Sequence, residues 1–227
     1  MKPQEIEIPR EVPVMTLSQC VLFPQAMMPI FIFEPRYREM LRRVLEQDRI
    51  FAVAALDDRR EDAEALETPY SIASVGVVRA CKQNADGTSN LILQGLARVE
   101  FESFVSEEPY RCARIHQVLS ESDGSTQTMG KIQPTLLALM QTQKRLGADI
   151  PQEVLQFLSN IKEPENVLDL AIYTLCPDGR FKQELLETRG IHARFEKFVV
   201  ALRTQIERLK LDNQLKGGLG KDNIGNN

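Results

Sequence analysis

Cysteine and histidine offer the most reactive side chains in this sequence, but their spacing does not assemble a catalytic pair. Cys112 and His116 lie four residues apart in a segment with strand character. In a strand both side chains would point to one face, about 13 Å apart at about 3.3 Å per residue. A thiol and its base must lie within hydrogen-bonding distance. His192 is the only other histidine, and neither histidine has a ligand-like grouping of cysteines or carboxylates in its neighbourhood of the sequence. The sequence therefore predicts no cysteine nucleophile, no metal site and no cofactor.

The glycines near the C-terminus do not complete a nucleotide-binding motif. A phosphate-binding loop of the form GxxxxGK must be followed by Ser or Thr, whose hydroxyl binds magnesium. Here Gly220 and Lys221 are followed by Asp222, and Leu215 stands at the position of the first glycine. The sequence also has no GxSxG turn, which would present a serine nucleophile. It therefore predicts a protein that is not an enzyme.

Charged residues gather in a few places without forming a recognisable site. Carboxylates cluster at 57–67 and 107–108, and charge runs of this kind are usually solvated surface. One predicted helix carries four arginines: Arg36, Arg38, Arg42 and Arg43. These arginines form either the solvent face of that helix or a contact surface for an acidic client or nucleic acid.

The segment QAMMPIFIF at 25–33 is unusually apolar for a stretch that a proline interrupts. Methionine adapts to partners of varied shape, and exposed apolar surface marks interaction sites. We therefore select five candidate residues for contact with a bound peptide: Phe23, Met27, Met28, Phe31 and Phe33. The alternative is that these side chains pack in the core or in a hairpin, because alternation along a strand buries every second residue.

Composition favours an ordinary folded protein. The 227 residues are 43% hydrophobic and 26% charged, with a net charge of −4 and a pI near 5.4. These values argue against wholesale disorder and give no global attraction to phosphates or acidic membranes. No stretch approaches the roughly 20 apolar residues of a membrane span, and the polar N-terminal residues lack the apolar region of a signal peptide. With four cysteines scattered outside any CxxC spacing, we expect buried thiols, a cytoplasmic location and no membrane partner.

Residues 1–119 are predicted to form a β subdomain. Alternating or continuous apolar runs indicate strands at 5–8, 12–17, 29–33, 50–56 and 110–119. Six of the twelve prolines fall before residue 40, which favours a barrel-like or strongly bent sheet over a flat one. Glu34-Pro35 opens a helix at 35–47, and the charged, aperiodic segment 57–70 is predicted to be an exposed loop.

The clearest local signal is a hairpin. IASVGVVRACKQ and LILQGLARVEFESF flank NADGTSN, where Asp86-Gly87 supplies the positive φ angle that a tight reversal demands. Gly76 and Gly95 within these strands predict bulges or sharp bends, which the closing of a small barrel requires.

The second subdomain, at 120–215, is predicted to be a helical bundle, because the apolar period becomes helical after the linker SESDGST at 120–126. Helices are expected near 129–146, 152–161, 164–176, 179–188 and 191–214. The last helix carries one apolar stripe, which either packs on the preceding helices or joins a coiled-coil partner: Ile191, Phe195, Phe198, Val199, Leu202, Ile206 and Leu209. Residues 216–227 are predicted to be a flexible tail.

Several of these segments, taken together, resemble the N-terminal substrate-binding domain of Lon-type ATP-dependent proteases. The resemblance is strongest in three places: Val21-Leu22-Phe23-Pro24 followed by the 35–47 helix, Asp48-Arg49 before the strand at 50–56, and Val75-Gly76 through Asp86-Gly87-Thr88 to Gly95-Leu96-Ala97-Arg98. FKQELLE at 181–187 is similar to the helix that precedes the long connecting helix of the family. The resemblance spans most of the chain, and the order and spacing of the segments agree.

This resemblance implies an α+β fold, in which a PUA-like β pseudo-barrel is followed by an α-helical bundle that ends in a long helix. In full-length Lon such a domain contacts misfolded or tagged proteins and helps assembly, and cereblon-like adaptors also carry it. The motor and the serine–lysine protease unit of Lon follow the long helix. We therefore expect binding without ATP hydrolysis or peptide cleavage.

The leading hypothesis is a stand-alone, non-catalytic polypeptide-binding module that acts as an adaptor in protein quality control. Its expected partners are unfolded or tagged polypeptides, and a protease or chaperone in trans. One alternative is a PUA-like RNA-binding protein, which the acidic pI and the aromatic content of 6% disfavour. Another is an oligomerisation scaffold, a homo-oligomer formed through the helix at 191–214.

Overall fold

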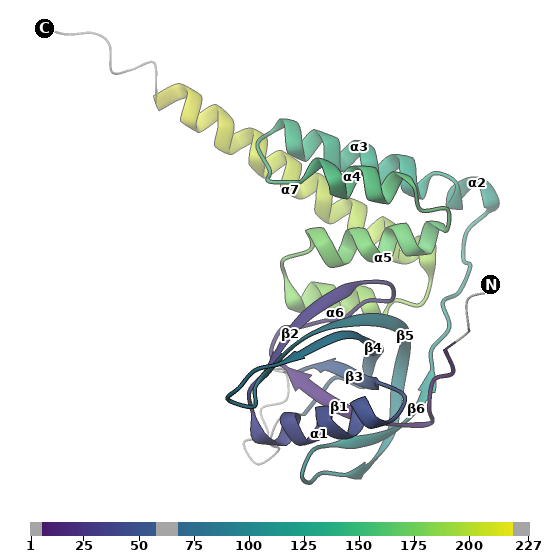
Figure 1. The fold of residues 1–227 in the computed structure, drawn as a ribbon. Coiled ribbons are helices and arrows are strands. Elements are labelled where there is room, and N and C mark those ends of the chain that lie inside the picture. The colour runs from purple at the N-terminus through teal and green to yellow at the C-terminus, as the bar shows by residue number, and fades with distance from the viewer. Residues whose placement is uncertain (1–5, 58–67, 220–227) are drawn as a thin grey trace, which may run out of the picture. The chain divides into compact units, whose positions relative to one another are not determined.

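The computed structural model describes residues 6–57 and 68–219, and the chain divides into two compact units (Figure 1). The first is Met1–Ser120 with Ile172–Arg189, and the second is Glu121–Ala171 with Gly190–Asn227. The predicted boundary lies between residues 119 and 120. In the observed division Ser120 and residues 172–189 belong to the unit that contains the strands.

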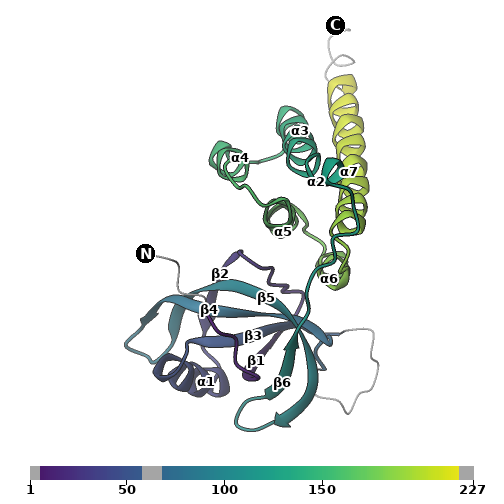
Figure 2. The same ribbon diagram turned by 90° about the vertical axis from the view of Figure 1, so that its right-hand side faces the viewer.

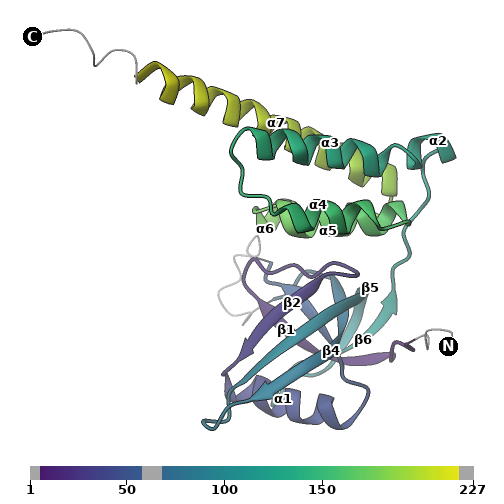
Figure 3. The same cartoon turned by 45° about the horizontal axis from the view of Figure 1, so that its top comes forward.

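Six strands of the first unit form one mixed sheet in the order β2-β5-β4-β3-β1-β6. β5 also pairs with β6, so the strands form a ring (Figure 3). β1 and β3 are parallel, and the remaining pairs are antiparallel. The bounds are Glu11–Leu17 for β1, Met27–Ile32 for β2, Ile50–Ala55 for β3, Ile72–Gln83 for β4, Ser89–Ser106 for β5 and Cys112–Gln117 for β6.

β5 closes the ring because it is long enough to meet three neighbours. Residues 89–94 pair with β2, residues 99–106 pair with β6, and β4 runs along most of its length. The register between β4 and β5 shifts where Gly76 lies opposite Gly95. A Cβ on Gly76 would lie 2.6 Å from the Leu93 side chain, so glycine permits the close approach of the two strands. The predicted irregularity at this pair of glycines is confirmed.

The hairpin between β4 and β5 and the first helix also agree with prediction. Gly87 has a φ of +81° at the tip of the hairpin. Helix α1, Pro35–Glu46, begins at its proline and packs beside β1 (Figure 2). Its buried side chains are Tyr37, Met40, Leu41 and Val44. Most of the predicted loop at 57–70, residues 58–67, lies outside the described residues.

The predicted strand at 5–8 is wrong where it can be compared. Residues 6–8 have no regular structure, and Glu5 lies outside the described residues. Ile8 is partly buried against the core of the first unit. The apolar alternation in this segment therefore reflects a single packed side chain rather than sheet pairing.

Residues 172–189 join the first unit through hydrogen bonds between α6 and the strands. They comprise the end of α5, Pro164–Leu175, and the whole of α6, Gly179–Glu187. Gln183 Nε2 donates to the carbonyl oxygen of Ile72 at 2.9 Å, and Arg98 Nε donates to that of Leu186 at 3.2 Å. Both donors are buried. One of these bonds runs from α6 to a carbonyl of β4 and the other from β5 to a carbonyl of α6, and together they hold α6 against the strands.

The second unit is helical, and α7 provides much of its core. Its other helices are α2, Thr126–Met129, α3, Ile132–Arg145, α4, Gln152–Ser159, and α5 up to Ala171, while α7 is Ile191–Leu219. The predicted stripe of α7 packs within this unit through its buried members Phe195, Phe198, Val199, Leu202 and Ile206. Residues 216–219 of the predicted tail continue α7, and the rest of that tail lies outside the described residues. None of the described helices is long and apolar enough to cross a membrane.

A buried ion pair fixes α7 to α5 within the second unit. Arg194 is 0% exposed, and its Nη1 lies 3.1 Å from Oδ1 of Asp169, which is 1% exposed. Its Nη2 lies 3.0 Å from Oε1 of Glu165. Because water does not solvate this guanidinium, the two carboxylates on α5 must compensate its charge.

The side chain of Asp123 caps the N-terminus of α7 by accepting hydrogen bonds from N–H groups in its first turn. Its two carboxylate oxygens accept from the N–H of His192 at 2.7 Å and from the N–H of Ala193 at 3.0 Å. Partial burial opposes ionisation, but these two hydrogen bonds outweigh it and hold the pKa of Asp123 below its ordinary value. The side chain is therefore an N-terminal cap that acts through its charged form.

Asp123→Ala is expected to lower the free energy of unfolding by about 1 kcal/mol at neutral pH, because a helix cap is lost. A carboxylate with a lower pKa in the folded state stabilises above its unfolded-state pKa, and this contribution is lost as the pH falls through the folded-state value. The difference from wild type should therefore begin to shrink below about pH 4, near the pKa of an unfolded carboxyl, and disappear only below the lowered folded-state pKa. Urea unfolding at several pH values measures it, with Asp149→Ala at an exposed position of the same unit as control. An undiminished difference at pH 3 would contradict the role of the charge.

Candidate interaction surface

β2 is an edge strand that exposes alternate apolar side chains. Within the described part of the chain, β5 is its one partner in the sheet. Met27 is 49% exposed, Phe31 is 53% exposed, and Phe33, just after the strand, is 59% exposed. Phe23 and Met28 are buried, at 0% and 4%. Three of the five candidate residues therefore face solvent, whereas the core-packing alternative describes the other two.

The turn before β2 determines which of its side chains face outward. The N–H of Ala26 donates to the carbonyl oxygen of Phe23 at 3.2 Å, and the N–H of Gln25 donates to that of Gly95 at 2.9 Å. Gln25 has a φ of 66°. This left-handed conformation is uncommon for a residue other than glycine and is typical of a tight turn. A one-residue slip in this register would exchange the buried and exposed rows of β2.

The exposed row of β2 continues onto its neighbours. Pro29 lies opposite Ile92 of β5, which in turn lies opposite Ala80 of β4. The rings of Phe31 and Phe33 stack with their centroids 6.0 Å apart. A hollow of about 370 Å³ opens among Pro29, Phe31, Ile92 and Ala80. We call this surface the β2 face, defined by Met27, Pro29, Phe31, Phe33, Ala80 and Ile92.

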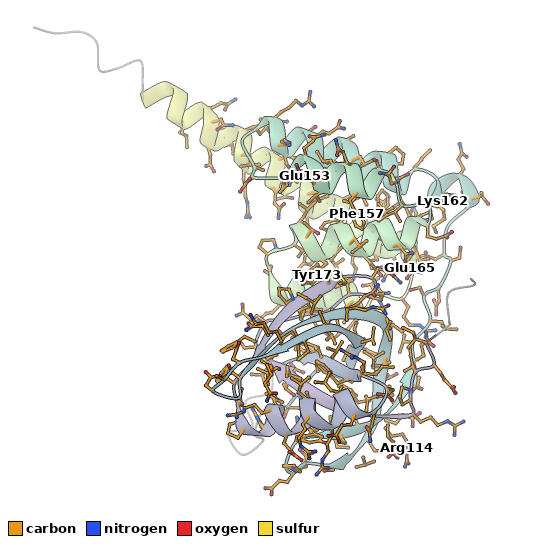
Figure 4. The ribbon with its side chains drawn as sticks, in the orientation of Figure 1. Arg114, Glu153, Phe157, Lys162, Glu165 and Tyr173 are labelled. Atoms are coloured by element: carbon orange, nitrogen blue, oxygen red, sulfur yellow. The ribbon has the colours of Figure 1, made fainter. Side chains whose placement is uncertain are left out.

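The end of α5 and α6 support the β2 face near its first residue. The hydroxyl of Tyr173, labelled in Figure 4, donates to the carbonyl oxygen of Met27 at 3.4 Å. Lys182 Nζ in turn donates to the carbonyl oxygen of Tyr173 at 3.0 Å. Burial raises the pKa of Tyr173 and lowers the pKa of Lys182. Cys20 lies behind the strand, with its Sγ 3.8 Å from Sδ of Met28. Burial raises the pKa of this thiol, which disfavours the reactive thiolate.

The histidine on β6 has carboxylate neighbours that the sequence analysis missed. Nε2 of His116 lies 3.3 Å from Oε2 of Glu100, and Nδ1 lies 3.2 Å from Oε1 of Glu102. The register of β5 against β6 places Glu100 opposite His116, which no local sequence signal indicates. Cys112 lies on the same strand, and burial raises the pKa of its thiol. No group of three or more histidine, cysteine and acidic side chains that could hold a metal ion occurs in the described ranges.

The arginines of α1 are largely compensated within their own helix. Arg42 pairs with Glu39 at 2.8 Å and with Glu46 at 3.3 Å, and Arg43 pairs with Glu39 at 3.0 Å. The hydrogen bond from Arg42 holds the pKa of Glu39 below its ordinary value. Arg36 pairs with Glu34 at 2.9 Å. These pairs favour the solvent-face interpretation over an uncompensated basic surface.

The family of the chain follows from a comparison of its sequence with a family model. The model described as the ATP-dependent protease La (LON) substrate-binding domain matches residues 11–204. The chain belongs to the LON substrate-binding domain family. All residues of the β2 face, from residues 27–33, β4 and β5, lie inside the matched range.

Relatives with this LON substrate-binding domain are longer proteins. Lon protease of Desulfosudis oleivorans is 26% identical over 219 residues, which are 95% of this chain and 26% of that protein. Lon protease of Dictyoglomus thermophilum is 26% identical over 213 residues, which are 94% of this chain and 27% of that protein. The chain thus spans about a quarter of the length of these curated relatives.

Solved LON N-terminal domains share the fold. The N-terminal domain of Mycobacterium avium complex Lon protease covers 86% of this chain and 98% of its own, with a TM-score of 0.65 and 16% identity. The Lon N-terminal domain protein from Xanthomonas campestris covers 84% and 97%, with a TM-score of 0.61 and 18% identity. These matches confirm the predicted α+β fold of a strand ring followed by helices that end in a long helix.

Proposed function

We propose that this chain binds extended polypeptide segments through the β2 face and performs no catalysis itself. The observation that carries the proposal is the row of Met27, Phe31 and Phe33, which are about half exposed on an edge strand. Membership of the LON substrate-binding domain family supports a role in substrate recognition. The burial of Phe23 and Met28 restricts the contact residues to the outward-facing row.

An edge strand suits unfolded clients for a physical reason. An unfolded segment displays apolar side chains and unpaired backbone groups. Beside an exposed strand the backbone groups can form hydrogen bonds and the apolar side chains can pack. Alternate client side chains would rest on the row of β2, while Pro29 contributes a carbonyl oxygen but no N–H. Ordering the client costs conformational entropy, so each contact is weak and the range of clients is broad.

The wider role that fits such binding is that of an adaptor in protein quality control, acting with a protease or chaperone in trans. Its clients are unfolded or tagged polypeptides. A reducing compartment such as the cytoplasm fits this role, since the four cysteines are free thiols. RNA binding is less well supported, because three of the four arginines of α1 are paired with glutamates: Arg36, Arg42 and Arg43.

The double substitution Met27→Ser with Phe31→Ser is expected to weaken binding of a permanently unfolded, carboxymethylated model protein about tenfold. Each substitution removes apolar area that the client would cover, at about 25 cal/mol per Å². Fluorescence anisotropy of the labelled client measures the dissociation constant. Both side chains are exposed, so the folded state should be unaffected.

The matched control removes exposed apolar side chains elsewhere. Val105 on β5 is 45% exposed and Phe157 on α4, labelled in Figure 4, is 59% exposed. Val105→Ser with Phe157→Ser should leave the affinity within about twofold of wild type. Wild-type protein that fails to bind the client, or a β2-face variant that binds it as well as wild type does, would refute the proposal.

A homo-oligomer formed through α7 is the second candidate function. It is favoured by Leu211 and Leu215, which are 58% and 68% exposed one helical turn apart. Light scattering of wild type and of Leu211→Asp with Leu215→Asp distinguishes this scaffold from a monomeric binding module.

A further inference from the structure

Two cationic side chains of β4 lie beside the β2 face. Lys82 and Arg79 of β4 are exposed beside the apolar row. Lys82 lies opposite Asn90 of β5 and lines the hollow that Phe31 also lines. Arg79 Nε donates to Oε1 of Gln94 at 2.6 Å, and Gln94 lies opposite Met27 of β2. Two cations thus mark the two ends of the apolar row.

The strand between β2 and β4 adds no charge at its outward-facing positions. Outward-facing positions of β5 between the cations are Asn90, Ile92 and Gln94. Among the described ion pairs, neither Lys82 nor Arg79 has a carboxylate partner, in contrast to Arg42 and Arg43 of α1. The nearest acidic residue along β4 and its turn is Asp86, whose pKa is lowered by hydrogen bonds from Thr88.

Resting on the proposed function, we infer that the β2 face selects extended polypeptide segments in which acidic side chains flank apolar ones. The apolar row accepts alternate aromatic or aliphatic side chains of the client. Lys82 and Arg79 attract the client's carboxylates, which flank its apolar side chains. Like charges in a lysine-rich client would instead be repelled, so charge decides between segments of equal hydrophobicity.

A polypeptide suits this surface better than a nucleic acid does. Single-stranded nucleic acid requires a groove of cations that follows its backbone, together with stacking rings. The face offers two exposed cations and, between them, an apolar hollow lined by Pro29, Ala80 and Ile92. A nucleic acid carries a phosphate at every nucleotide, so the two cations would leave most of its negative charges uncompensated. A peptide with one or two carboxylates would be fully compensated by the same cations.

The test uses three short labelled peptides with the same alternating phenylalanines and leucines. Their polar positions carry glutamate, glutamine or lysine, and anisotropy gives the dissociation constant of each for the full chain. We expect the glutamate peptide to bind about fivefold more tightly than the lysine peptide, with the glutamine peptide between them. The difference should shrink as salt is raised, because both cations are exposed.

Charge reversal provides the decisive variant. Lys82→Glu with Arg79→Glu should invert the order, so that the lysine peptide binds more tightly than the glutamate peptide. Since one peptide gains affinity, an unfolded variant cannot produce this result. The control Arg145→Glu with Arg208→Glu changes the net charge equally at exposed positions of α3 and α7 and should preserve the wild-type order.

The outcomes separate this inference from the proposed function. Equal affinity for all three peptides would overturn the charge selection and leave polypeptide binding intact. Failure of every peptide and of the unfolded client would refute both. Tighter binding of a single-stranded RNA of mixed sequence, lost in the charge-reversal variant, would assign the face to nucleic acid and overturn the inference.

Discussion

Replacing Arg194 with alanine is expected to lower the free energy of unfolding by about 3–5 kcal/mol, because it leaves buried carboxylate charge without its partner. Asp169 is 1% exposed and lies 3.1 Å from the guanidinium that the substitution removes. The alanine also leaves a cavity between α5 and α7, where Arg194 is among the largest fully buried side chains. Urea unfolding followed by circular dichroism measures the loss.

Two further variants show whether the lost charge or the lost volume accounts for most of the decrease in the free energy of unfolding. Arg194→Met with Asp169→Leu removes the two fully buried charges and fills the space, while Glu165 is about one-third exposed to water, so the variant should recover most of the lost stability. Arg203→Ala, at an exposed position of the same helix, should change stability by less than about 0.5 kcal/mol. A loss in Arg194→Ala no larger than that in Arg203→Ala would show that the buried pair does not stabilise the second unit.

Gly95→Ala is expected to destabilise the first unit by about 1–3 kcal/mol and to weaken client binding. A Cβ at this position would collide with the carbonyl oxygen of Phe23 and would lie 2.9 Å from its carbonyl carbon. Backbone atoms cannot rotate away as a side chain can, so the turn before β2 must shift. That turn determines which side chains of β2 face outward.

Gly130→Ala serves as the matched control. Gly130 has helical φ and ψ angles, and its Cβ would make contacts no closer than 3.5 Å. Stability and binding should therefore be close to wild type. If Gly95→Ala were as stable as this control and bound clients normally, the turn would not determine the register of the β2 face.

Local features of this fold were predictable where a few neighbouring residues determine the backbone. Asp86-Gly87 predicts the hairpin because a positive φ is needed there, and Pro35 predicts the start of α1. Alternation at 27–32 predicts that about half of the candidate residues are buried. It cannot predict which half, because that depends on the hydrogen bonds of Gln25 and Ala26 in the preceding turn.

Features that depend on distant partners were not predictable. α6 has an ordinary amphipathic sequence, and its place in the first unit follows from the contacts of Gln183 and Arg98 with backbone carbonyls far along the chain. Arg194 belongs to a helix with many charged residues, so nothing local distinguishes it as buried. The carboxylates beside His116 likewise come from a cross-strand register.

The first unit is assembled from two stretches of sequence with most of the second unit encoded between them. During synthesis, β2 therefore leaves the ribosome long before α6, which completes the unit that carries it. At roughly 5–20 residues per second, the interval between residues 27 and 189 is on the order of ten seconds. Throughout that interval a nascent chain presents the row of Met27 and Phe31 without its supporting helix, so this protein is itself a candidate for chaperone capture while it is being made.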